Sequence, residues 1–395
     1  MKIVINGMSA RLGGGRTYLV NLLAHLPMRA DLQVRVFAPD DLRLPADPRV
    51  QRVHTAWPTT NPLLRALWER FALPAYLRRV GAQVLFCPGG VVATRVPAGC
   101  RLVTMFRNMI PFDPSLMRRM PWGWQRVRNL ILRRVMLRSL ARADLSIFVS
   151  DHARALIERL ARIPNPVTIP HGIGDAFRTA GRPLPRPPEA PAGEYLLYVS
   201  RFDIYKHHRE VVQAFADLPA PSRDRLCLVF LGETDMPEAA PVAEQVHRLG
   251  LDDRVLMPGA VPYASLPAWY QHATLIVFAS SCENCPNILL EALGAGRPVV
   301  SSDVMPMPEF GGPGLVYFSP ADPKTLTDAL RSILDSPAIA KRVAMAAGDR
   351  SGRYEWSRTA AETWGQVLAL AGEGPDAIRR PFPAEAQPFP RNLDI

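Results

Sequence analysis

A chain of 395 residues with 48% hydrophobic residues is larger than the roughly 250–300 residues that one hydrophobic core usually encloses, so we expect two domains. No apolar run approaches the roughly 18 uncharged residues that span a bilayer, so any membrane contact must be at the surface. Five irregularly spaced cysteines, and an opening stretch Met1–Ile5 too short for a signal region, fit a reducing cytoplasm.

The formal net charge of +11 is divided unevenly along the chain. Residues 1–180 contain 27 Lys and Arg against 10 Asp and Glu, a balance of +17, whereas residues 181–395 contain 20 against 26, or −6. Eight arginines and no acidic residue lie between Asp113 and Asp144, interleaved with tryptophan and aliphatic residues. This pattern is typical of a basic amphipathic segment.

We expect the basic segment to face an anionic membrane surface through Arg118, Arg119, Trp122, Trp124, Arg126 and Arg128. A solvated helix whose apolar stripe packs on its own domain would give the same pattern. Arginine beside aromatic residues also suits nucleic acid, but we find no nucleic-acid-binding motif and expect no such partner.

Short apolar runs alternate with helical patterns along the first half, which is typical of a doubly wound parallel α/β sheet. The expected strands are 2–6, 33–37, 84–87, 102–105, 145–149 and 167–169, and the expected helices are 17–26, 63–79, 124–141 and 151–160.

The same order repeats in the second half of the chain. The expected strands are 195–199, 226–231, 255–257, 275–279, 299–301 and 316–318, and the expected helices are 210–215, 241–249, 264–269, 288–295 and 324–334. We therefore predict two Rossmann-like domains, 1–180 and 194–354, with a ligand cleft between them. A proline-rich linker at 181–193, a helix at 355–371 and a loosely ordered proline-rich tail at 372–395 complete the division.

A glycine-rich turn, Gly13–Gly15, follows the first expected strand and leads directly into a helix. We expect Gly14 and Gly15 to bind a ligand, because glycine lets the backbone approach closely and a helix start offers free N–H groups to an anion. A structural turn is the alternative. A dinucleotide site fits poorly, because the last glycine of G-x-G-x-x-G is missing.

Two cationic residues, Arg201 and Lys206, follow the first expected strand of the second domain. At the carboxyl end of a parallel strand they would lie at the cleft, where they could neutralise a diphosphate without a metal ion. A solvated turn is the alternative. His207 and His208 are predicted to support the helix start, because no further ligand follows at metal-binding spacing.

Two glutamates, Glu283 and Glu291, stand eight positions apart in an otherwise apolar segment. Glu283 is expected in the loop after a buried strand and Glu291 inside the next helix, with free N–H groups at Asn287, Ile288 and Leu289 between them. A carboxylate can accept two hydroxyl hydrogen bonds, so the order diol, anion, diol would suit a nucleotide sugar.

Cys282 and Cys285 form a C-x-x-C pair beside Glu283, so a zinc or redox module is an alternative. The other cysteines, at 87, 100 and 227, supply no second pair, and we expect no metal ion and no cofactor. Asn284 and Asn287 in the same segment are candidates for selecting the sugar.

The chain resembles the retaining nucleotide-sugar glycosyltransferases of the GT-B fold, in the large family 4 class. The resemblance runs through most of the chain and rests on seven segments: the glycine turn, His171–Ile173 with Phe177, Ser200–Arg201 with Lys206, the E-x7-E pair, Gly296–Val300, Met307–Glu309 and Trp356–Ala360. It implies that Arg201 and Lys206 grip the donor diphosphate, Glu283 contacts the transferred sugar and Glu291 binds the ribose.

The resemblance further implies metal-independent transfer with retention at the anomeric carbon. It also implies that domain 1–180 binds the acceptor, that domain 194–354 binds the nucleotide sugar, and that the last helix crosses back to the first domain. Many relatives carry a His-Asp pair where this chain reads Arg107-Asn108, so these two residues, with His171, are expected to support catalysis or contact the acceptor. We expect a glycan or lipid-linked glycan acceptor at the inner face of the membrane, in bacterial cell-surface polysaccharide or lipopolysaccharide synthesis. A nucleotide-sugar epimerase and a non-catalytic sugar-binding protein are the alternatives.

Overall fold

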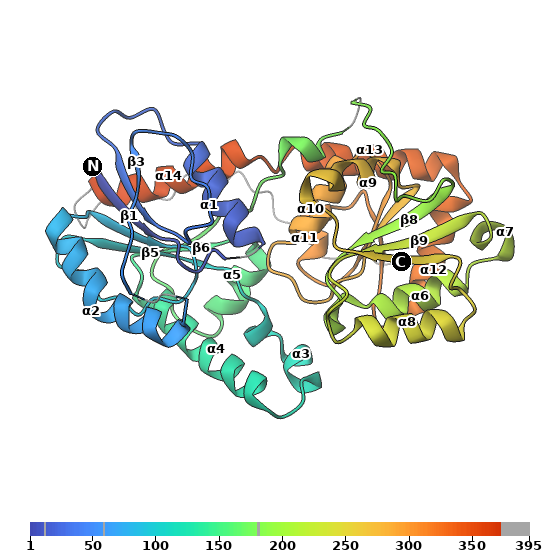
Figure 1. Ribbon diagram of the computed structural model, residues 1–395, viewed down its shortest axis with the longest axis horizontal. Helices are drawn as coiled ribbons and strands as arrows, with labels where there is room; N and C mark the ends of the chain where they lie inside the picture. Colours follow the sequence, from blue (N-terminus) through green and yellow to red (C-terminus); the bar gives the residue numbers. More distant parts are fainter. Residues whose placement is uncertain (12, 58–59, 180–181, 373–395) are drawn as a thin grey trace.

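A computed structural model describes residues 1–11, 13–57, 60–179 and 182–372 of the chain. The described residues form two α/β domains that lie side by side, each built around a parallel sheet with helices on both faces (Figure 1). The predicted tail at 372–395 lies outside the described residues apart from Gly372, and the predicted linker lies partly outside them.

The N-terminal sheet has the strand order β3-β2-β1-β4-β5-β6-β7, and its pairings are parallel. Its central strands are continuous apolar runs because helices cover both faces. The strands are β1 (Lys2–Asn6), β2 (Gln33–Phe37), β3 (Val50–Arg52), β4 (Val84–Cys87), β5 (Arg101–Phe106), β6 (Leu145–Phe148) and β7 (Pro166–Thr168); the helices are α1 (Gly14–Ala24), α2 (Pro62–Val80), α3 (Pro114–Arg119), α4 (Trp124–Arg142) and α5 (Asp151–Glu158), with 3-10 turns η1 (Ile110–Phe112) and η2 (Asp175–Phe177).

The C-terminal sheet repeats this arrangement in the order β10-β9-β8-β11-β12-β13, again with parallel pairings. Its strands are β8 (Glu194–Val199), β9 (Leu226–Leu231), β10 (Val255–Gly259), β11 (Leu275–Phe278), β12 (Val299–Ser302) and β13 (Val316–Phe318); its helices are α6 (His208–Ala216), α7 (Ala220–Arg223), α8 (Ala239–Arg248), α9 (Leu266–His272), α10 (Asn287–Gly294), α11 (Met307–Gly311), α12 (Pro323–Leu334) and α13 (Pro337–Ser351), with η3 (Ile204–Lys206) and η4 (Tyr263–Ser265).

In each sheet the strand order reverses beside the first strand of the domain, between β1 and β4 and between β8 and β11. The loops that leave two such neighbouring strands diverge to opposite faces and open a crevice at the carboxyl edge of the sheet. These edges carry the glycine turn in the N-terminal domain and the lysine and glutamate loops in the C-terminal domain.

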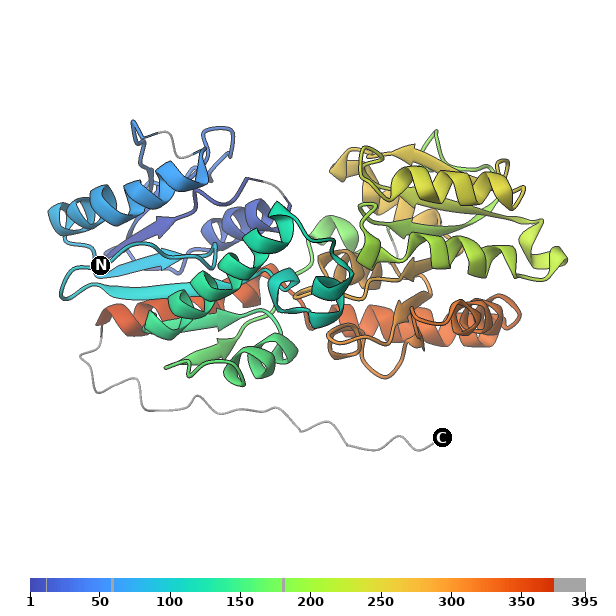
Figure 2. The same ribbon diagram turned by 90° about the horizontal axis from the view of Figure 1, so that it is seen from below.

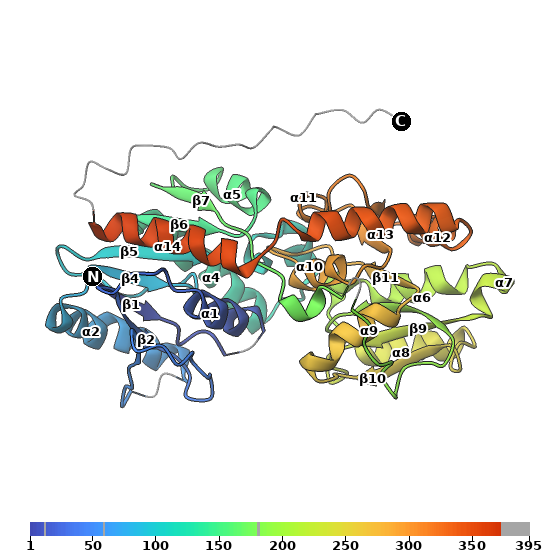
Figure 3. The ribbon, with the colours of Figure 1, turned by 90° about the horizontal axis from the view of Figure 1, so that it is seen from above.

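The long C-terminal helix α14 (Trp356–Gly372) lies against the N-terminal domain (Figure 3). Trp364 is buried there and donates a hydrogen bond from Nε1 to the carbonyl of Leu22 over 2.9 Å. The chain crosses between the domains beside Ile173, whose N–H donates to the carbonyl of Tyr354 over 2.9 Å. A Cβ on Gly172 would come within 2.6 Å of Cα of Trp356, so glycine permits this close crossing.

Every strand and helix predicted from the sequence is present, with ends shifted by no more than a few residues. Among the described residues, five helices and strands were not predicted, namely β3, α3, α7, α11 and α13, nor were the 3-10 turns. Strand β3 is a short, half-exposed edge strand without an apolar alternation. Helix α13 did carry a start signal, because Ser336 caps it and Pro337 occupies its first position.

Candidate active site

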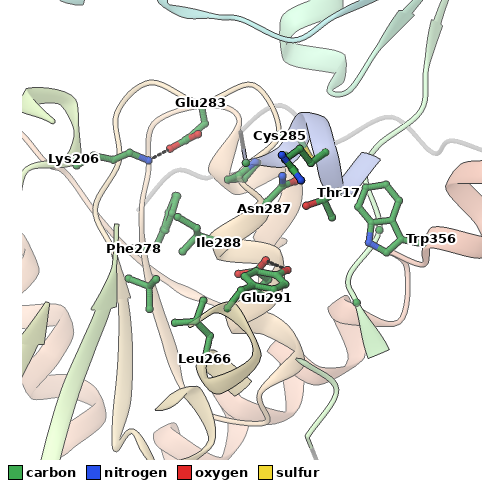
Figure 4. A pocket seen from close by; sticks show the side chains of 18 residues that line it. Thr17, Lys206, Leu266, Phe278, Glu283, Cys285, Asn287, Ile288, Glu291 and Trp356 are labelled. Atoms are coloured by element: carbon green, nitrogen blue, oxygen red, sulfur yellow. Dashed lines mark hydrogen bonds and ion pairs between the residues drawn. The ribbon is translucent and has the colours of Figure 1, made fainter. Parts of the chain in front are cut away.

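A cleft of about 650 Å³ opens between the two domains at the carboxyl edges of both sheets (Figure 4). The N-terminal domain contributes the start of α1, and the C-terminal domain contributes the loops after β8 and β11 and the start of α10. The lining residues are Gly13, Gly14, Arg16, Thr17, Gly172, Gly174, Val199, Lys206, Tyr263, Leu266, Phe278, Glu283, Cys285, Pro286, Asn287, Ile288, Glu291 and Trp356.

Lys206 and Glu283 form an ion pair at one end of the cleft, as Figure 4 shows. They meet because β8 and β11 are hydrogen-bonded neighbours, and each residue lies in the loop that follows its strand. Lys206 is 6% exposed, and its Nζ lies 5.2 Å from the ring centre of Tyr205 and 5.6 Å from that of Phe278. These contacts fix the ammonium group in the cleft rather than in solvent.

The start of α10 lies between the two glutamates. The N–H of Asn287 donates to the carbonyl of Cys285 over 2.9 Å, and the first helical bond runs from the N–H of Leu290 to the carbonyl of Pro286 over 3.0 Å. The N–H groups of Ile288 and Leu289 have no acceptor within the helix, as is usual in a first turn. Ile288 lines the cleft, so this helix start can receive an anion.

Glu291 lies one turn further into the cleft, where its Oε1 accepts a hydrogen bond from the hydroxyl of Tyr263 over 2.7 Å. The residue is 9% exposed, and burial raises the pKa of its carboxyl to about 7. Tyr263 was not anticipated from the sequence, because nothing local marks a tyrosine in the β10–α9 connection as a partner of a distant glutamate.

Arg201 does not line this cleft. Its side chain is 58% exposed and pairs with Glu233 over 3.1 Å, in an adjoining hollow of about 160 Å³. Val199, Leu266 and Ile288 line both spaces, so the two are neighbours. The expected grip of Arg201 on a diphosphate would require this side chain to leave Glu233 and turn toward α10.

The glycine turn brings the N-terminal domain against the start of α10. A Cβ on Gly14 would lie 2.6 Å from Nδ2 of Asn287 and 3.2 Å from Nη2 of Arg107, and a Cβ on Gly15 would lie 3.7 Å from Nη1 of Arg107. Gly14 thus permits close contact between the two domains. Arg107 follows β5 and lies beside this contact, although it does not itself line the open part of the cleft.

His171 lies at the domain junction, between the rings of Tyr18 and Trp356, each 5.4 Å away. Its Nδ1 donates to Oδ1 of Asn287 over 2.9 Å. Burial, together with the neighbouring Arg107, lowers the pKa of His171 to about 3, so the ring is neutral. His171 therefore supports the position of Asn287.

Both asparagines considered for sugar selection make hydrogen bonds within the protein, and Asn287 also lines the cleft. Asn284 reaches the N-terminal domain, where its Nδ2 donates to the carbonyl of Phe106 over 3.0 Å and its Oδ1 accepts from the hydroxyl of Ser150 over 3.3 Å. Asn287 is held by His171. Asn108 caps the turn η1, because its Oδ1 accepts from the N–H of Ile110 over 3.2 Å.

A second contact between the domains involves Glu309 of α11. Its two carboxylate oxygens accept the N–H groups of Asp151 and His152, over 2.8 and 2.9 Å, at the start of α5. A carboxylate from the C-terminal domain thereby caps a helix of the N-terminal domain, where the helix dipole favours negative charge. The described arrangement of the two domains is held by these specific polar contacts.

Cys282 and Cys285 are unbonded and packed. Cys282 packs among N-terminal-domain residues near Phe106, and burial raises the pKa of both thiols, that of Cys285 to about 12. A thiol with a raised pKa is a poor nucleophile and a poor metal ligand. Among the described residues, no group of three or more His, Cys, Asp or Glu side chains could hold a metal ion.

The basic segment forms α3 and α4, which project from the lower side of the N-terminal domain in Figure 1 and lie toward the viewer in Figure 2. Trp122 and Trp124 are 78% and 74% exposed, and the guanidinium of Arg126 lies 4.0 Å from the ring centre of Trp122. Val127 and Ile131 are also exposed, at helical spacing from Trp124. No helix within the described ranges has the length and apolar character needed to cross a bilayer.

Two arginines of the predicted membrane face lie at the end of α3. Arg118 and Arg119 are both exposed, and Arg119 also lines a small hollow of about 130 Å³ shared with the C-terminal domain, beside His207, Glu210 and Glu238. Met136 and Leu140 of α4 pack in the core of the N-terminal domain, as the alternative of a solvated helix packed on its own domain predicts, while Trp124, Val127 and Ile131 remain exposed.

Two family profiles match this chain, one in each domain. The profile described as Glycosyltransferase Family 4 matches residues 12–177, and the profile described as Glycosyl transferases group 1 matches residues 185–350.

Curated relatives match over part of their length. A D-inositol 3-phosphate glycosyltransferase of Frankia alni is 29% identical over 178 residues, 42% of this chain and 43% of the relative. An O-antigen chain mannosyltransferase B of Escherichia coli is 29% identical over 209 residues, 50% of this chain and 52% of the relative. The chain spans about half the length of the curated relatives that it matches.

Solved structures match over nearly their whole length. Sucrose-phosphate synthase from Thermosynechococcus elongatus has a TM-score of 0.73 at 20% identity, covering 93% of this chain and 98% of the other. Anabaena HepE, solved with UDP-glucose, has a TM-score of 0.65 at 18% identity and coverage of 93% and 100%. WaaG, involved in lipopolysaccharide biosynthesis, has a TM-score of 0.69 at 13% identity and coverage of 93% and 99%.

At these identities the structural likeness establishes the fold, which is GT-B. The profile matches take in most of both domains and agree with the motifs in the sequence. This chain therefore belongs to the group 1, family 4 glycosyltransferases.

Proposed function

We propose that this protein transfers a sugar from a nucleotide-diphosphate sugar to a glycan or a lipid-linked glycan. One observation carries the proposal. The ion pair of Lys206 and Glu283, the free N–H groups at the start of α10, and Glu291 with Tyr263 follow one another along a single cleft. A sugar, a diphosphate and a ribose occur in that order in such a donor.

Each group along the cleft has a chemistry that suits its place. The carboxylate of Glu283 can accept hydroxyl hydrogen bonds from the transferred sugar, and Glu291 can accept those of the ribose. Lys206 and the N–H groups of Ile288 and Leu289 can stabilise the negative charge that develops on the leaving diphosphate. Arg201 would join them after leaving Glu233.

We infer transfer with retention of anomeric configuration and without a metal ion. Departure of the diphosphate and attack by the acceptor on the same face would place both events beside Lys206. The cationic and helix-start groups supply the charge stabilisation that Mg²⁺ provides in other phosphate sites. Turnover that persists in EDTA, with an α-linked product from an α-linked donor, would support this inference, and loss of turnover in EDTA would contradict metal independence.

We propose that the exposed stripe on α3 and α4 docks on the anionic inner face of the membrane, where a lipid-linked acceptor would be found. Exposed tryptophans beside arginines suit the headgroup region of an anionic bilayer. Similarity to an O-antigen mannosyltransferase and to WaaG supports a role in cell-surface polysaccharide or lipopolysaccharide synthesis.

The donor is tested by measuring the melting temperature of the protein with UDP, GDP, dTDP and ADP sugars, followed by a product assay. We expect one nucleotide to raise the melting temperature, and its sugar to be transferred. Binding without any turnover would favour a non-catalytic sugar-binding protein, and conversion of the sugar without an acceptor would favour an epimerase.

The membrane surface is tested by flotation with vesicles of phosphatidylglycerol and phosphatidylethanolamine, against vesicles of phosphatidylcholine alone. We expect the protein to float with the anionic vesicles at low salt and to be released as salt rises. A protein that stays at the bottom of the gradient at low salt would rule out the docking proposal without affecting the donor assignment.

A further inference from the structure

Arg107 is a positively charged group without a counter-charge. Within the described part of the chain its guanidinium makes no hydrogen bond and no ion pair, and its Cζ lies 5.4 Å from the ring centre of Tyr18. The other cationic groups around the cleft are paired: Lys206 with Glu283, Arg201 with Glu233 and Arg16 with Asp41. Of these four cationic residues, Arg107 is thus the one without a carboxylate partner.

The surroundings of Arg107 make this lack of a partner costly. Burial lowers the pKa of its guanidinium, although the group stays charged at any physiological pH. Arg107 is half-buried, and a charge partly removed from water without a counter-charge costs free energy, which the contact with the Tyr18 ring offsets only in part. The arrangement is expected where an anion arrives with the ligand.

The anion would meet several donors at this point. Nη2 of Arg107 and Nδ2 of Asn287 both lie within 3.2 Å of the position that a Cβ on Gly14 would take. The free N–H groups of Ile288 and Leu289 belong to the same helix start as Asn287, and α1 begins at Gly14. Hydrogen-bond donors from both domains therefore lie near the contact between Gly14 and Asn287, in the middle of the cleft.

We propose that Arg107 binds the distal phosphate of the nucleotide donor, so that the N-terminal domain supplies a cation to the leaving group. The inference rests on the proposed function and adds a residue to it. As the bond from the anomeric carbon to the phosphate oxygen breaks, its electron pair remains on that oxygen. The acceptor oxygen forms the new bond, and its proton leaves with the phosphate.

Contact between the domains then becomes a condition for catalysis. Arg107 belongs to the N-terminal domain, whereas Lys206 and the helix start belong to the C-terminal domain. Charge stabilisation from both sides exists when Gly14 and Asn287 are in contact, as they are here. Without that contact a bound donor would lack the guanidinium, and transfer of its sugar would be slower.

The test compares binding of a nucleoside diphosphate and of its monophosphate by calorimetry, using the nucleotide that raises the melting temperature of the wild-type protein most. The variants are R107Q, R107K and, as a matched control, R248Q, which removes an exposed charge from α8. We expect R107Q to weaken diphosphate binding about 10- to 100-fold, as for a lost charge-assisted hydrogen bond. R107K should lie between R107Q and wild type, and monophosphate binding should change less than about twofold.

A second readout separates binding from packing. Because the guanidinium lacks a counter-charge, R107Q without ligand should melt at the same temperature as the wild-type protein or higher. A large fall in melting temperature, or failure of R107Q to fold, would contradict the proposal by showing that Arg107 stabilises the protein itself.

Three further outcomes would overturn the proposal. Diphosphate affinity in R107Q within twofold of wild type, with turnover lost, would assign the anion to the acceptor. Equal losses for diphosphate and monophosphate would place the contact away from the distal phosphate. If the wild-type protein binds no nucleoside diphosphate at all, both the proposed function and the role of Arg107 fail. If it does bind one but R107Q binds it equally well, only the role of Arg107 fails.

Discussion

The two domains share one strand order, yet they differ in the positive charge that they leave without a carboxylate partner. In the C-terminal domain the cationic groups near the cleft have carboxylate partners, as in the pairs of Lys206 with Glu283 and Arg201 with Glu233. In the N-terminal domain Arg16 is likewise paired with Asp41, but Arg107 has no counter-charge among the described residues, and the basic segment at α3 and α4 leaves arginines and tryptophans exposed. The balance of +17 over residues 1–180 against −6 over residues 181–395 reflects this difference.

This comparison indicates that the two domains, which share one architecture, have different tasks. The C-terminal domain holds a fixed set of polar groups that could receive a donor before the acceptor arrives. The N-terminal domain presents uncompensated positive charge, which suits groups that meet a membrane surface or a phosphate only when a complex forms. The following predictions test this difference in charge between the two domains.

Lys206 should show the largest effect, because its ammonium is the buried cation at the sugar end of the cleft. We expect K206A to lower turnover about 100- to 1,000-fold, as for loss of a preorganised charge at a leaving group. Steady-state kinetics with the identified donor would measure this, with exposed K341A as the control. Turnover near the wild-type value would show that the site is assigned wrongly.

A loss of folding could imitate that result, because K206A leaves the half-buried carboxylate of Glu283 without its partner. The double variant K206A/E283Q removes the unpaired carboxylate. Its melting temperature should therefore exceed that of K206A while its turnover remains low.

The basic face of α4 should show the next effect. We expect R126Q/R128Q to weaken partition onto anionic vesicles about 30-fold, because each basic residue near such a surface contributes about 1 kcal/mol. Quantitative sedimentation of vesicles would measure it. The control R248Q/R342Q removes two exposed charges from the C-terminal domain and should change partition little; an equal effect would indicate attraction by net charge alone.

Glu291 should control donor affinity. We expect E291Q to raise the KM for the donor about 10- to 30-fold, since an amide accepts hydroxyl hydrogen bonds less strongly than a carboxylate. Because the carboxyl has a pKa of about 7, the wild-type KM should also rise as the pH falls below 7, when the group becomes protonated. If the KM of E291Q depends on pH as the wild-type KM does, titration of Glu291 is not the cause of that dependence.

The same residue should lower the stability of the protein above neutral pH. With a folded-state pKa of about 7 against an ordinary 4.5, the folded protein holds this proton more tightly, so the free energy of unfolding falls as pH rises between these values. E291Q avoids the cost of holding a charged carboxylate at this buried position. We therefore expect it to be more stable than the wild-type protein by about 1–3 kcal/mol at pH 8. Urea unfolding at pH 5 and pH 8 would test this, because the gain should shrink at pH 5.

Asn284 should show the smallest effect. N284A removes two hydrogen bonds between the domains, and at about 0.5 kcal/mol each, the low end of the usual range, we expect kcat to fall about 5-fold. Binding of the nucleoside diphosphate should change less than twofold. N165A, which removes a hydrogen bond to the carbonyl of Asp144 within one domain, is the matched control; a similar loss of kcat there would remove the link to domain contact.

The fold could be predicted because both halves carry apolar strands bounded by turn residues, and this pattern leaves few topologies open. The positions of Lys206, Glu283 and Glu291 in one cleft followed from the rule that loops at the carboxyl ends of parallel strands meet. Tyr263 could not be found in this way, because its partner lies 28 residues away on another element.

The sequence by itself determined two doubly wound domains, the family, and the loops that carry the donor groups, because local periodicity and spacing encode them. The tertiary structure decided which charges are paired. It turned Arg201 to Glu233, joined Asn284 and Glu309 to the other domain, and left Arg107 without a counter-charge. Such pairings depend on distances between elements far apart in the chain, which the order of residues along one strand or helix does not contain.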